Sequence, residues 1–463
     1  MKYRIEKDSL GNVKVPIEFY WGTQTQRAIE NYPNVGLRFQ KRFVIAQAII
    51  KKAAAVANMK TRRLEKIIGN AIVKAASEII DGNHLEQFIL PPHQSGAGVS
   101  QNMNMNEVIA NRAIETLGGK KGDYKLVHPN DHVNMSQSTN DTIHTAIHVA
   151  AYTTLQELLI PSLEKYQKEM EKKANQFKHI IKSGRTHLQD AVPLTLAQEF
   201  SGYFILNRIE TLRNVSRHLL DLPLGGTAVG TGINAHPKYG KIAIGEINKM
   251  TGFKFKQTRH MFASMQNLNV ELEVSGALKT IASNFIKISN DLRLLSSGPV
   301  TGLWEITLPP LQPGSSIMPG KINPVMPEMM QMICYQVIGN DATITHATSE
   351  GELELNVMMP VVAYNLLNSI ELLAAGISAF AEKCVKGIKA NEKRIKELLE
   401  KNPIIITALT PYIGYNKAAE VVKRAYKENK TIEEVVLEMK LLDKKQVGKI
   451  MDFKKLVKSS AIK

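Results

Sequence analysis

Two stretches of the chain carry apolar residues at spacings that alternate between four and three, and this pattern constrains the fold most. The first seam consists of Val274, Leu278, Ile281, Phe285, Ile288, Leu292 and Leu295. The second consists of Ala363, Leu367, Ile370, Ala374, Ile377, Ala381 and Cys384. Such a seam is the a/d repeat of helices that pack along their length. Each seam predicts a helix longer than the ~11–12 residue mean, and long seamed helices are typical of an elongated bundle.

Two more long helices are expected at 141–161 and 196–220. Between the helical stretches lie loops rich in Gly, Ser, Thr, Asn and Pro, at 93–106, 128–141, 183–193, 224–239 and 309–327. Polar loops on a rigid scaffold are where binding chemistry tends to lie.

The composition changes along the chain. Short helices and polar loops alternate up to residue 137, and Lys/Glu-rich short helices follow residue 390. We therefore predict an all-α chain of three domains. These are an N-terminal domain at 1–137, a central helical-bundle domain at 138–390 and a small C-terminal helical domain at 391–463.

Charge and cysteine content favour a soluble cytoplasmic protein. The 59 Lys and Arg outnumber the 43 Asp and Glu, but they are scattered and aromatic residues are only 6%. This distribution is typical of a solvated lysine-rich surface, so we expect no nucleic-acid partner. Cys334 and Cys384 form no Cys-x-x-Cys pair, which argues against a disulfide framework. No charge-free apolar run reaches ~18 residues, so we expect no membrane span.

The segment Gly-Ser-Ser-Ile-Met-Pro-Gly-Lys-Ile-Asn-Pro at 314–324 is the sharpest motif in the chain. Its glycines and prolines make it a poor helix or strand, and two adjacent hydroxyls precede a lysine. From composition alone, a surface turn and a functional loop remain equally good interpretations.

The segment resembles the signature loop of the aspartase/fumarase superfamily. Residues 128–141 and 184–191 (Gly-Arg-Thr-His-Leu-Gln-Asp-Ala) resemble two further blocks of that family, in the same order. The resemblance extends over essentially the whole chain. It implies a mostly helical subunit of three domains whose central helices join those of three other subunits in one bundle. It also implies a homotetramer, composite active sites built from three subunits, and no cofactor.

The chemistry of this family explains the residue types. Its members eliminate a group from C2 of a small succinate-like dicarboxylate and leave fumarate. The C3 proton is very weakly acidic, so the carbanion must spread into the adjacent carboxylate as an enediolate. Hydroxyl, amide and cationic donors must therefore surround that carboxylate in a site that excludes water.

By resemblance, Ser315 is the general base, and its pKa must be lowered by loop amides and the nearby Lys321. The resemblance assigns one substrate carboxylate to Thr186, Lys321 and Asn323. It assigns the carboxylate that becomes the enediolate to Ser138, Thr139 and Ser316. It brings His187 and Asn140 to the leaving group, and pairs Glu328 with His187.

Local sequence divides between two branches of the family. Segments 138–140, 190–193, 290–299, 324–328 and 355–358 resemble aspartate ammonia-lyases, whereas 20–22 and 224–227 resemble fumarate hydratases. The prediction is reversible deamination of L-aspartate to fumarate and ammonia. The alternative is a class II fumarate hydratase that acts on malate. A non-catalytic bundle scaffold is the third hypothesis, which the intact set of site residues disfavours.

Three details qualify this prediction. Val99 stands where both branches usually have a threonine, which removes a substrate contact of about 1–3 kcal/mol unless the hydroxyl of Ser100 compensates. This change leaves open a third dicarboxylate as substrate. Glycine-rich 225–232 lies in no βαβ unit, so no dinucleotide is expected. The histidine pairs 128/132 and 144/148 can each share a helix face, but no His-Glu-x-x-His accompanies them, so no metal is expected.

Overall fold

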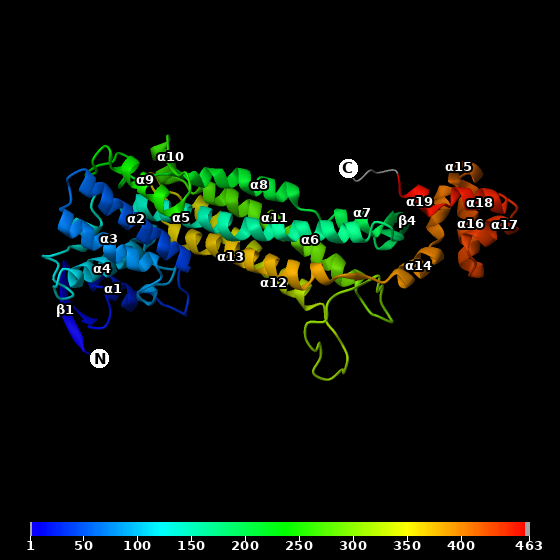
Figure 1. Ribbon diagram of the computed structural model, residues 1–463, viewed down its shortest axis with the longest axis horizontal. Helices are drawn as coiled ribbons and strands as arrows, with labels where there is room; N and C mark the ends of the chain where they lie inside the picture. Colours follow the sequence, from blue (N-terminus) through cyan, green and yellow to red (C-terminus); the bar gives the residue numbers. More distant parts are fainter. Residues whose placement is uncertain (1, 459–463) are drawn as a thin grey trace. The chain divides into compact units, whose positions relative to one another are not determined.

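The computed structural model describes residues 2–458, and most of them are helical (Figure 1). Strands of the described residues occur in two-stranded pairs. These pairs are β1 (Tyr3–Asp8) with β2 (Gly11–Pro16), β3 (Ile181–Thr186) with β4 (Gln189–Thr195), β5 (Asp221–Leu222) with β6 (Lys256–Gln257), and β7 (Ile306–Thr307) with β8 (Lys389–Ala390). The predicted all-α class is confirmed.

The described residues include three helices of 25 residues or more, α11 (Asn269–Leu295), α12 (Val325–Ser349) and α13 (Met359–Lys383). The first predicted seam lies on α11, and the second lies on α13 and ends at Cys384, directly after it. Every residue of both seams is buried. By length and composition alone, Met359–Gly387 could cross a membrane, but 56% of its apolar window is buried within the protein. Burial of this kind is expected of the core helix of a bundle.

Contacts divide the chain into two compact units. The first comprises the stretch up to Pro161, Asn207–Ala282 and Ile333–Ala375. The second comprises Ser162–Leu206, Ser283–Met332 and the stretch from Gly376 onward. The three-domain division at 137 and 390 stays a prediction.

Helices around α2 (Lys41–Lys60) build the first unit. They are α1 (Thr23–Asn31), α3 (Lys66–Ile80), α4 (Val99–Thr116), α5 (Thr139–Thr154), α9 (Tyr239–Thr251) and α10 (Met261–Gln266). Helix α2 contacts α3, α5 and α9, and alanines supply much of its buried surface. Small side chains let several helices approach one axis closely, so α2 is buried on more than one face.

Two apolar clusters organise the second unit. The rings of Tyr166, Phe285 and Phe380 pack together, with Tyr166 on α6 (Ile160–Gln176). A second cluster, with Leu409, Val421 and Val435 at its centre, joins the C-terminal helices. Those helices are α14 (Glu392–Lys401), α15 (Thr410–Ile413), α16 (Tyr415–Glu428), α17 (Ile432–Glu438), α18 (Lys444–Ile450) and α19 (Phe453–Leu456).

The prediction of one continuous helix at 196–220 is wrong. The structure has α7 (Leu196–Ser201), α8 (Leu206–Ser216) and a 3₁₀ turn, Arg217–Leu220, in its place. Side chains of α6 form hydrogen bonds with the backbone groups at the break. The amide N–H of Ile205 donates to Gln167 at 2.7 Å, and the Tyr166 hydroxyl donates to the carbonyl of Tyr203 at 3.2 Å. Tertiary hydrogen bonds thus replace helical ones at 202–205.

The helix predicted at 141–161 is longer than expected. Helical backbone continues from α5 through a π-helical turn, Leu155–Leu159, into α6 and past Pro161. A proline lacks the N–H that an α-helix needs, and the wider turn just before it changes the register of the hydrogen bonds.

Candidate active site

The predicted signature loop, 314–324, is largely exposed and is called the strap below. Hydrogen bonds between its own residues hold its two ends together. The N–H of Gly314 donates to the carbonyl of Lys321 at 2.9 Å, and Asn323 Nδ2 donates to the carbonyl of Gly314 at 2.5 Å. A Cβ at position 314 would collide with the Lys321 carbonyl oxygen. The glycine is therefore required by close approach of the backbone, and Asn323 fixes the neck of the strap.

Ser315 receives two hydrogen bonds from this strap. Its Oγ accepts from the N–H of Ile317 at 3.2 Å and from the N–H of Met318 at 3.0 Å. Two backbone donors on one hydroxyl oxygen favour negative charge there, and so favour the alkoxide needed for proton abstraction. Lys321 and Ser316 are exposed. Within the described part of the chain, no hydrogen bond or ion pair engages the Lys321 ammonium.

His187 lies at the exposed tip of the β3–β4 hairpin, directly after Thr186. His187 and Leu188 form the two-residue turn with φ of 55° and 58°. A type I′ turn requires positive φ at both positions, where glycine or asparagine is usual. Left-handed backbone at an ordinary residue costs of order 1–3 kcal/mol and persists only where the surroundings hold it.

The base of the hairpin supplies this support. Lys182 is buried and pairs with Glu199 at 2.6 Å and with Glu305 at 3.0 Å. Glu305 is fully buried and also binds Arg185 at 3.0 Å. A buried charge network of this kind holds its partners rigidly because breaking any pair leaves an uncompensated charge. The strained tip at His187 is therefore built on a fixed base.

Glu328 lies in the first turn of α12. Among residues 2–458 of the single chain, no ion pair joins Glu328 to His187. The resemblance implies sites built from several subunits, and this pairing stays a prediction about the assembly.

Ser138 begins α5 as its N-cap, and Asp141 completes a capping box. The Asp141 Oδ1 atom accepts from the N–H of Ser138 at 3.0 Å, while Ser138 Oγ accepts from the N–H of Asn140 at 3.2 Å. Backbone N–H groups at a helix start favour anions. Ser138 and Thr139, predicted to bind a substrate carboxylate, and Asn140, predicted to approach the leaving group, thus lie at a helix start whose backbone favours an anion.

The glycine-rich loop at 225–232 docks on this helix start. Asp141 Oδ2 accepts from the N–H groups of Gly225 and Thr227, both at 3.0 Å, and Asn140 Nδ2 donates to the Ala228 carbonyl at 2.7 Å. Burial raises the pKa of Asp141 to about 6, against the lowering effect of these backbone donors. The loop that superficially resembles a dinucleotide motif is thus a support for α5.

Lys51 is a buried residue of this region that the sequence analysis missed. Its Nζ donates to Asn102 Oδ1 at 2.8 Å, Asn134 Oδ1 at 2.9 Å and Gln137 Oε1 at 3.0 Å. Asn102 Nδ2 in turn donates to Thr139 Oγ1 at 3.1 Å. The ammonium therefore fixes the amides that orient the Thr139 hydroxyl. The signal that could have revealed it is a lysine placed between the apolar residues Ile49–Ile50 and the alanines 53–55 of α2, although Lys52 beside it is partly exposed.

Val99 is the first residue of α4 and its side chain is 42% exposed. The neighbouring Ser100 hydroxyl is within 3.1 Å of Ser95 Oγ, which also accepts from the Ser100 N–H at 3.3 Å. Because the Ser100 hydroxyl already has this partner, it is not free to replace the missing threonine hydroxyl in this loop conformation.

The predicted site residues fall into two groups. Val99, Ser100, Ser138, Thr139 and Asn140 belong to the first unit. The second unit holds Thr186, His187, Ser315, Ser316, Lys321, Asn323 and Glu328. The first group presents hydroxyls and one amide at the starts of α4 and α5, whereas the second adds the cationic Lys321 and the imidazole of His187 to its hydroxyls and amide. The enediolate chemistry requires donors of both kinds.

Comparison with known proteins identifies the class. Residues 11–339 match the family described as Lyase, and residues 405–458 match the domain described as Fumarase C C-terminus. The chain is a lyase and belongs to the aspartase/fumarase superfamily, as the three motif blocks predicted.

Its relatives carry two different activities in their names. An aspartate ammonia-lyase from Bacillus sp is 49% identical over 451 residues, which cover 97% of this chain and 96% of that protein. A class II fumarate hydratase from Bacillus anthracis is 47% identical over 459 residues, 99% of each chain. The crystal structure of a class II fumarase from Schistosoma mansoni superposes with a TM-score of 0.96 at 36% identity, covering 99% of this chain and 100% of that one.

Replacing Lys51 by methionine should destabilise the protein in a pH-dependent way. Three amide oxygens, of which that of Asn102 is buried, lose the hydrogen bond from Lys51, so we expect a loss of about 3 kcal/mol of unfolding free energy. Burial lowers the pKa of Lys51 to about 7, against the raising effect of Asp141, from an ordinary value of 10.5. Between these values the unfolded chain binds more protons, so the contribution of Lys51 to stability rises with pH from about 7 to about 10.

Thermal unfolding measured at several pH values checks this expectation. The difference in Tm between wild type and Lys51→Met should widen from pH 7 to pH 9.5. Lys52→Met, which changes the adjacent and partly exposed lysine of α2, is the control and should show no such trend. A Tm difference for Lys51→Met that narrows over this range would contradict the assignment.

Proposed function

We propose that the chain is an aspartate ammonia-lyase that converts L-aspartate reversibly to fumarate and ammonia. The observation that carries the proposal is the Ser315 hydroxyl, which accepts two backbone N–H groups within the strap at 314–324. The relative at 49% identity and the Ser-Thr-Asn sequence at 138–140 favour aspartate over malate.

Ser315, as the alkoxide, takes the proton from C3 of the substrate. The C–H electron pair passes into the adjacent carboxylate, and the enediolate charge meets Ser138, Thr139 and Ser316. The pair then forms the C2–C3 double bond while the C2–N bond breaks and the ammonium group leaves as ammonia. Donors arranged in advance for the developing charge are the main source of acceleration in such a step.

Exposure of the strap and of His187 supports assembly into a homotetramer with composite sites. An enediolate needs a site that excludes water, yet Ser316, Lys321 and His187 are exposed in the single chain. Met332 and Tyr335 on α12 are 68% and 55% exposed, which is unusual for large apolar residues of a long helix. Other copies of the chain would cover these side chains and close the site around a small dicarboxylate.

We further propose a cytoplasmic location. Cys334 and Cys384 are both buried and unpaired, which agrees with a reducing compartment.

Fumarate hydratase is the second candidate, and the relative from Bacillus anthracis at 47% identity favours it. Both reactions use the same serine base and the same enediolate, so the strap does not distinguish them. The leaving group does, and the residues predicted near it are His187, Asn140 and the region of Val99.

Separate incubation with L-aspartate and L-malate tests the choice. Formation of fumarate, followed by its ultraviolet absorbance, should be rapid with aspartate and slow or absent with malate. Turnover of malate alone would transfer the assignment to fumarate hydratase. Absence of turnover with both would favour another dicarboxylate or the non-catalytic scaffold.

Replacing Ser315 by alanine should lower kcat by several orders of magnitude and leave the assembly intact, because only the base is removed. Ser349→Ala changes an exposed serine at the end of α12 and is the matched control, which should retain wild-type turnover. Size-exclusion chromatography checks the assembly. Near-normal activity of the Ser315 variant would show that another group removes the proton.

Replacing Val99 by threonine should leave the KM for aspartate unchanged or lower it, by up to about tenfold if one hydrogen bond of ~1–1.4 kcal/mol is gained. Val99→Ala separates the effect of the hydroxyl from that of volume and should not lower KM. A sharp rise in KM for the threonine variant would indicate that the valine serves a different ligand.

A further inference from the structure

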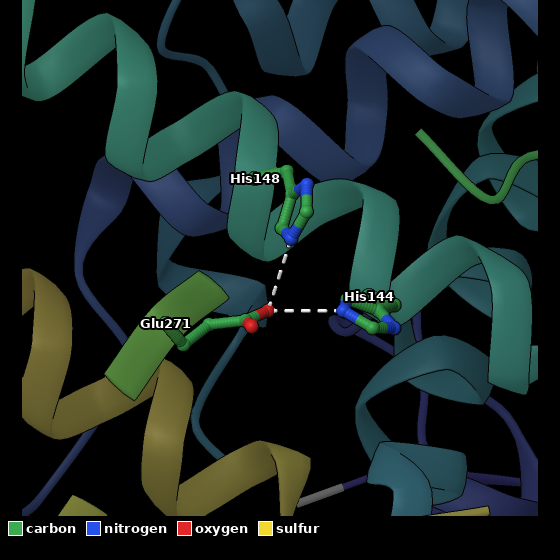
Figure 2. A group of neighbouring side chains, drawn as sticks. All are labelled: His144, His148 and Glu271. Carbon is green, nitrogen blue, oxygen red and sulfur yellow. Dashed lines mark ion pairs between the residues drawn. The ribbon is translucent and has the colours of Figure 1, made fainter. Parts of the chain in front are cut away.

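Two histidines and a glutamate to which the proposed reaction gives no role face one another inside the first unit (Figure 2). His144 and His148 lie one turn apart on α5, and Glu271 lies in the first turn of α11. The side chains of both histidines are 3% exposed and that of Glu271 is 0% exposed. Fully buried ionisable side chains need partners that compensate their desolvation.

The two distances from Glu271 to the histidines match the edges of a metal coordination shell. Glu271 Oε1 lies 3.0 Å from His144 Nε2 and 3.2 Å from His148 Nε2, and the three ligand atoms all lie within 4.8 Å of one another. Ligands about 2.0–2.2 Å from an ion are separated by roughly 2.9–3.5 Å at coordination angles from 90° to tetrahedral.

Hydrogen bonding within the group does not account for its burial. The two contacts are short enough for ion pairs, but neither has the alignment of a hydrogen bond. Among the described residues, both oxygens of Glu271 and the Nε2 atom of His148 lack a hydrogen-bond partner. Figure 2 shows the three side chains pointing toward one another from α5 and α11.

A backbone contact sets the protonation state of one histidine. His148 Nδ1 lies 2.9 Å from the carbonyl oxygen of Asp221, so Nδ1 carries the proton that it donates. In the neutral ring, Nε2 then presents a lone pair toward Glu271. An imidazole that binds a metal typically donates its other N–H to a carbonyl in this way.

Glu271 lies in the first turn of α11, where the positive end of the helix favours a carboxylate. The lone pair of His148 Nε2, the Nε2 atom of His144 and this carboxylate therefore meet in one buried place.

We propose that His144, His148 and Glu271 bind one divalent transition-metal ion of the zinc class at a structural site that joins α5 to α11. Two imidazole nitrogens and one carboxylate oxygen suit Zn²⁺ and Co²⁺, whereas Mg²⁺ and Ca²⁺ prefer all-oxygen sites. Three protein ligands leave a fourth position for water.

The proposed site differs from the expectation of no metal, and the difference lies in the third ligand. The i, i+4 histidine pair is visible in the sequence, but Glu271 comes from a distant helix and nothing local marks it. Asn140, His144 and His148 share one face of α5, and each is separated from the next by about 6 Å along the helix axis. The ion would therefore hold the helix whose first turn carries the predicted carboxylate-binding residues. The site does not depend on which dicarboxylate the enzyme uses.

Metal analysis of untagged full-length protein tests the proposal. The protein is expressed with added zinc, purified without chelator, and compared with chelator-treated protein reloaded with Zn²⁺ or Co²⁺ alone. Mass spectrometry of the bound metal should give one ion per chain. The cobalt form should show visible d–d absorption, and metal should raise Tm.

Two variants and a matched control locate the ion. His148→Gln and Glu271→Gln should each reduce bound metal at least tenfold. His218→Gln is the control, because His218 also pairs with a glutamate of α11, Glu273, at 2.8 Å, but both side chains are more than half exposed. It should bind metal like wild type.

Wild-type protein that holds no more metal than the Glu271→Gln variant would overturn the proposal, and the group would then be a buried His–Glu ion pair. Metal lost to the same extent in His218→Gln would equally overturn it, by showing adventitious surface binding. If a variant fails to fold, the stoichiometry and cobalt spectrum of wild type decide, since a chain without the site shows neither.

Discussion

One buried carboxylate holds the start of α5 in place, and much of the first unit's site depends on it. Asp141 accepts the N–H of Ser138 within the capping box and the N–H groups of Gly225 and Thr227 from the glycine-rich loop. A carboxylate with three backbone donors thus joins the start of α5 to the glycine-rich loop. Lys51 adds a second fixed point through Asn102 and the Thr139 hydroxyl. The hydroxyls and amides at 138–140 are therefore held before any substrate arrives.

In the β3–β4 hairpin, a rigid base supports a strained turn. The His187–Leu188 turn has two non-glycine residues at positive φ, and the buried network of Lys182, Glu199 and Glu305 fixes the strands below it. Strained backbone on a rigid base is typical of functional sites, because the surrounding contacts offset the local cost. In the proposed reaction, this arrangement would hold the imidazole at a defined place without relying on a flexible loop.

Sequence reasoning went furthest where a feature is local or periodic. The seams on α11 and α13 are periodic, and all of their residues are buried. The strap at 314–324 is a contiguous motif, and the family it resembles is the family of the chain. The break at 202–205 was missed because the backbone there forms hydrogen bonds with Gln167 and Tyr166, which lie on another helix. Lys51 and Glu271 were missed for the same reason, since their partners lie far from them in the sequence. The choice of substrate also remained a proposal, because it depends on loops such as that of Val99, where one methyl replaces one hydroxyl.

The hydrogen bonds to Ser315 come from Ile317 and Met318, only two and three positions further along the chain. In the proposed reaction, polarisation of the base is thus a property of an eleven-residue strap. Residues near the leaving group can then change while this polarisation of Ser315 is retained. This separation of the base from the residues near the leaving group agrees with the names of the relatives, which include both an aspartate ammonia-lyase and a fumarate hydratase.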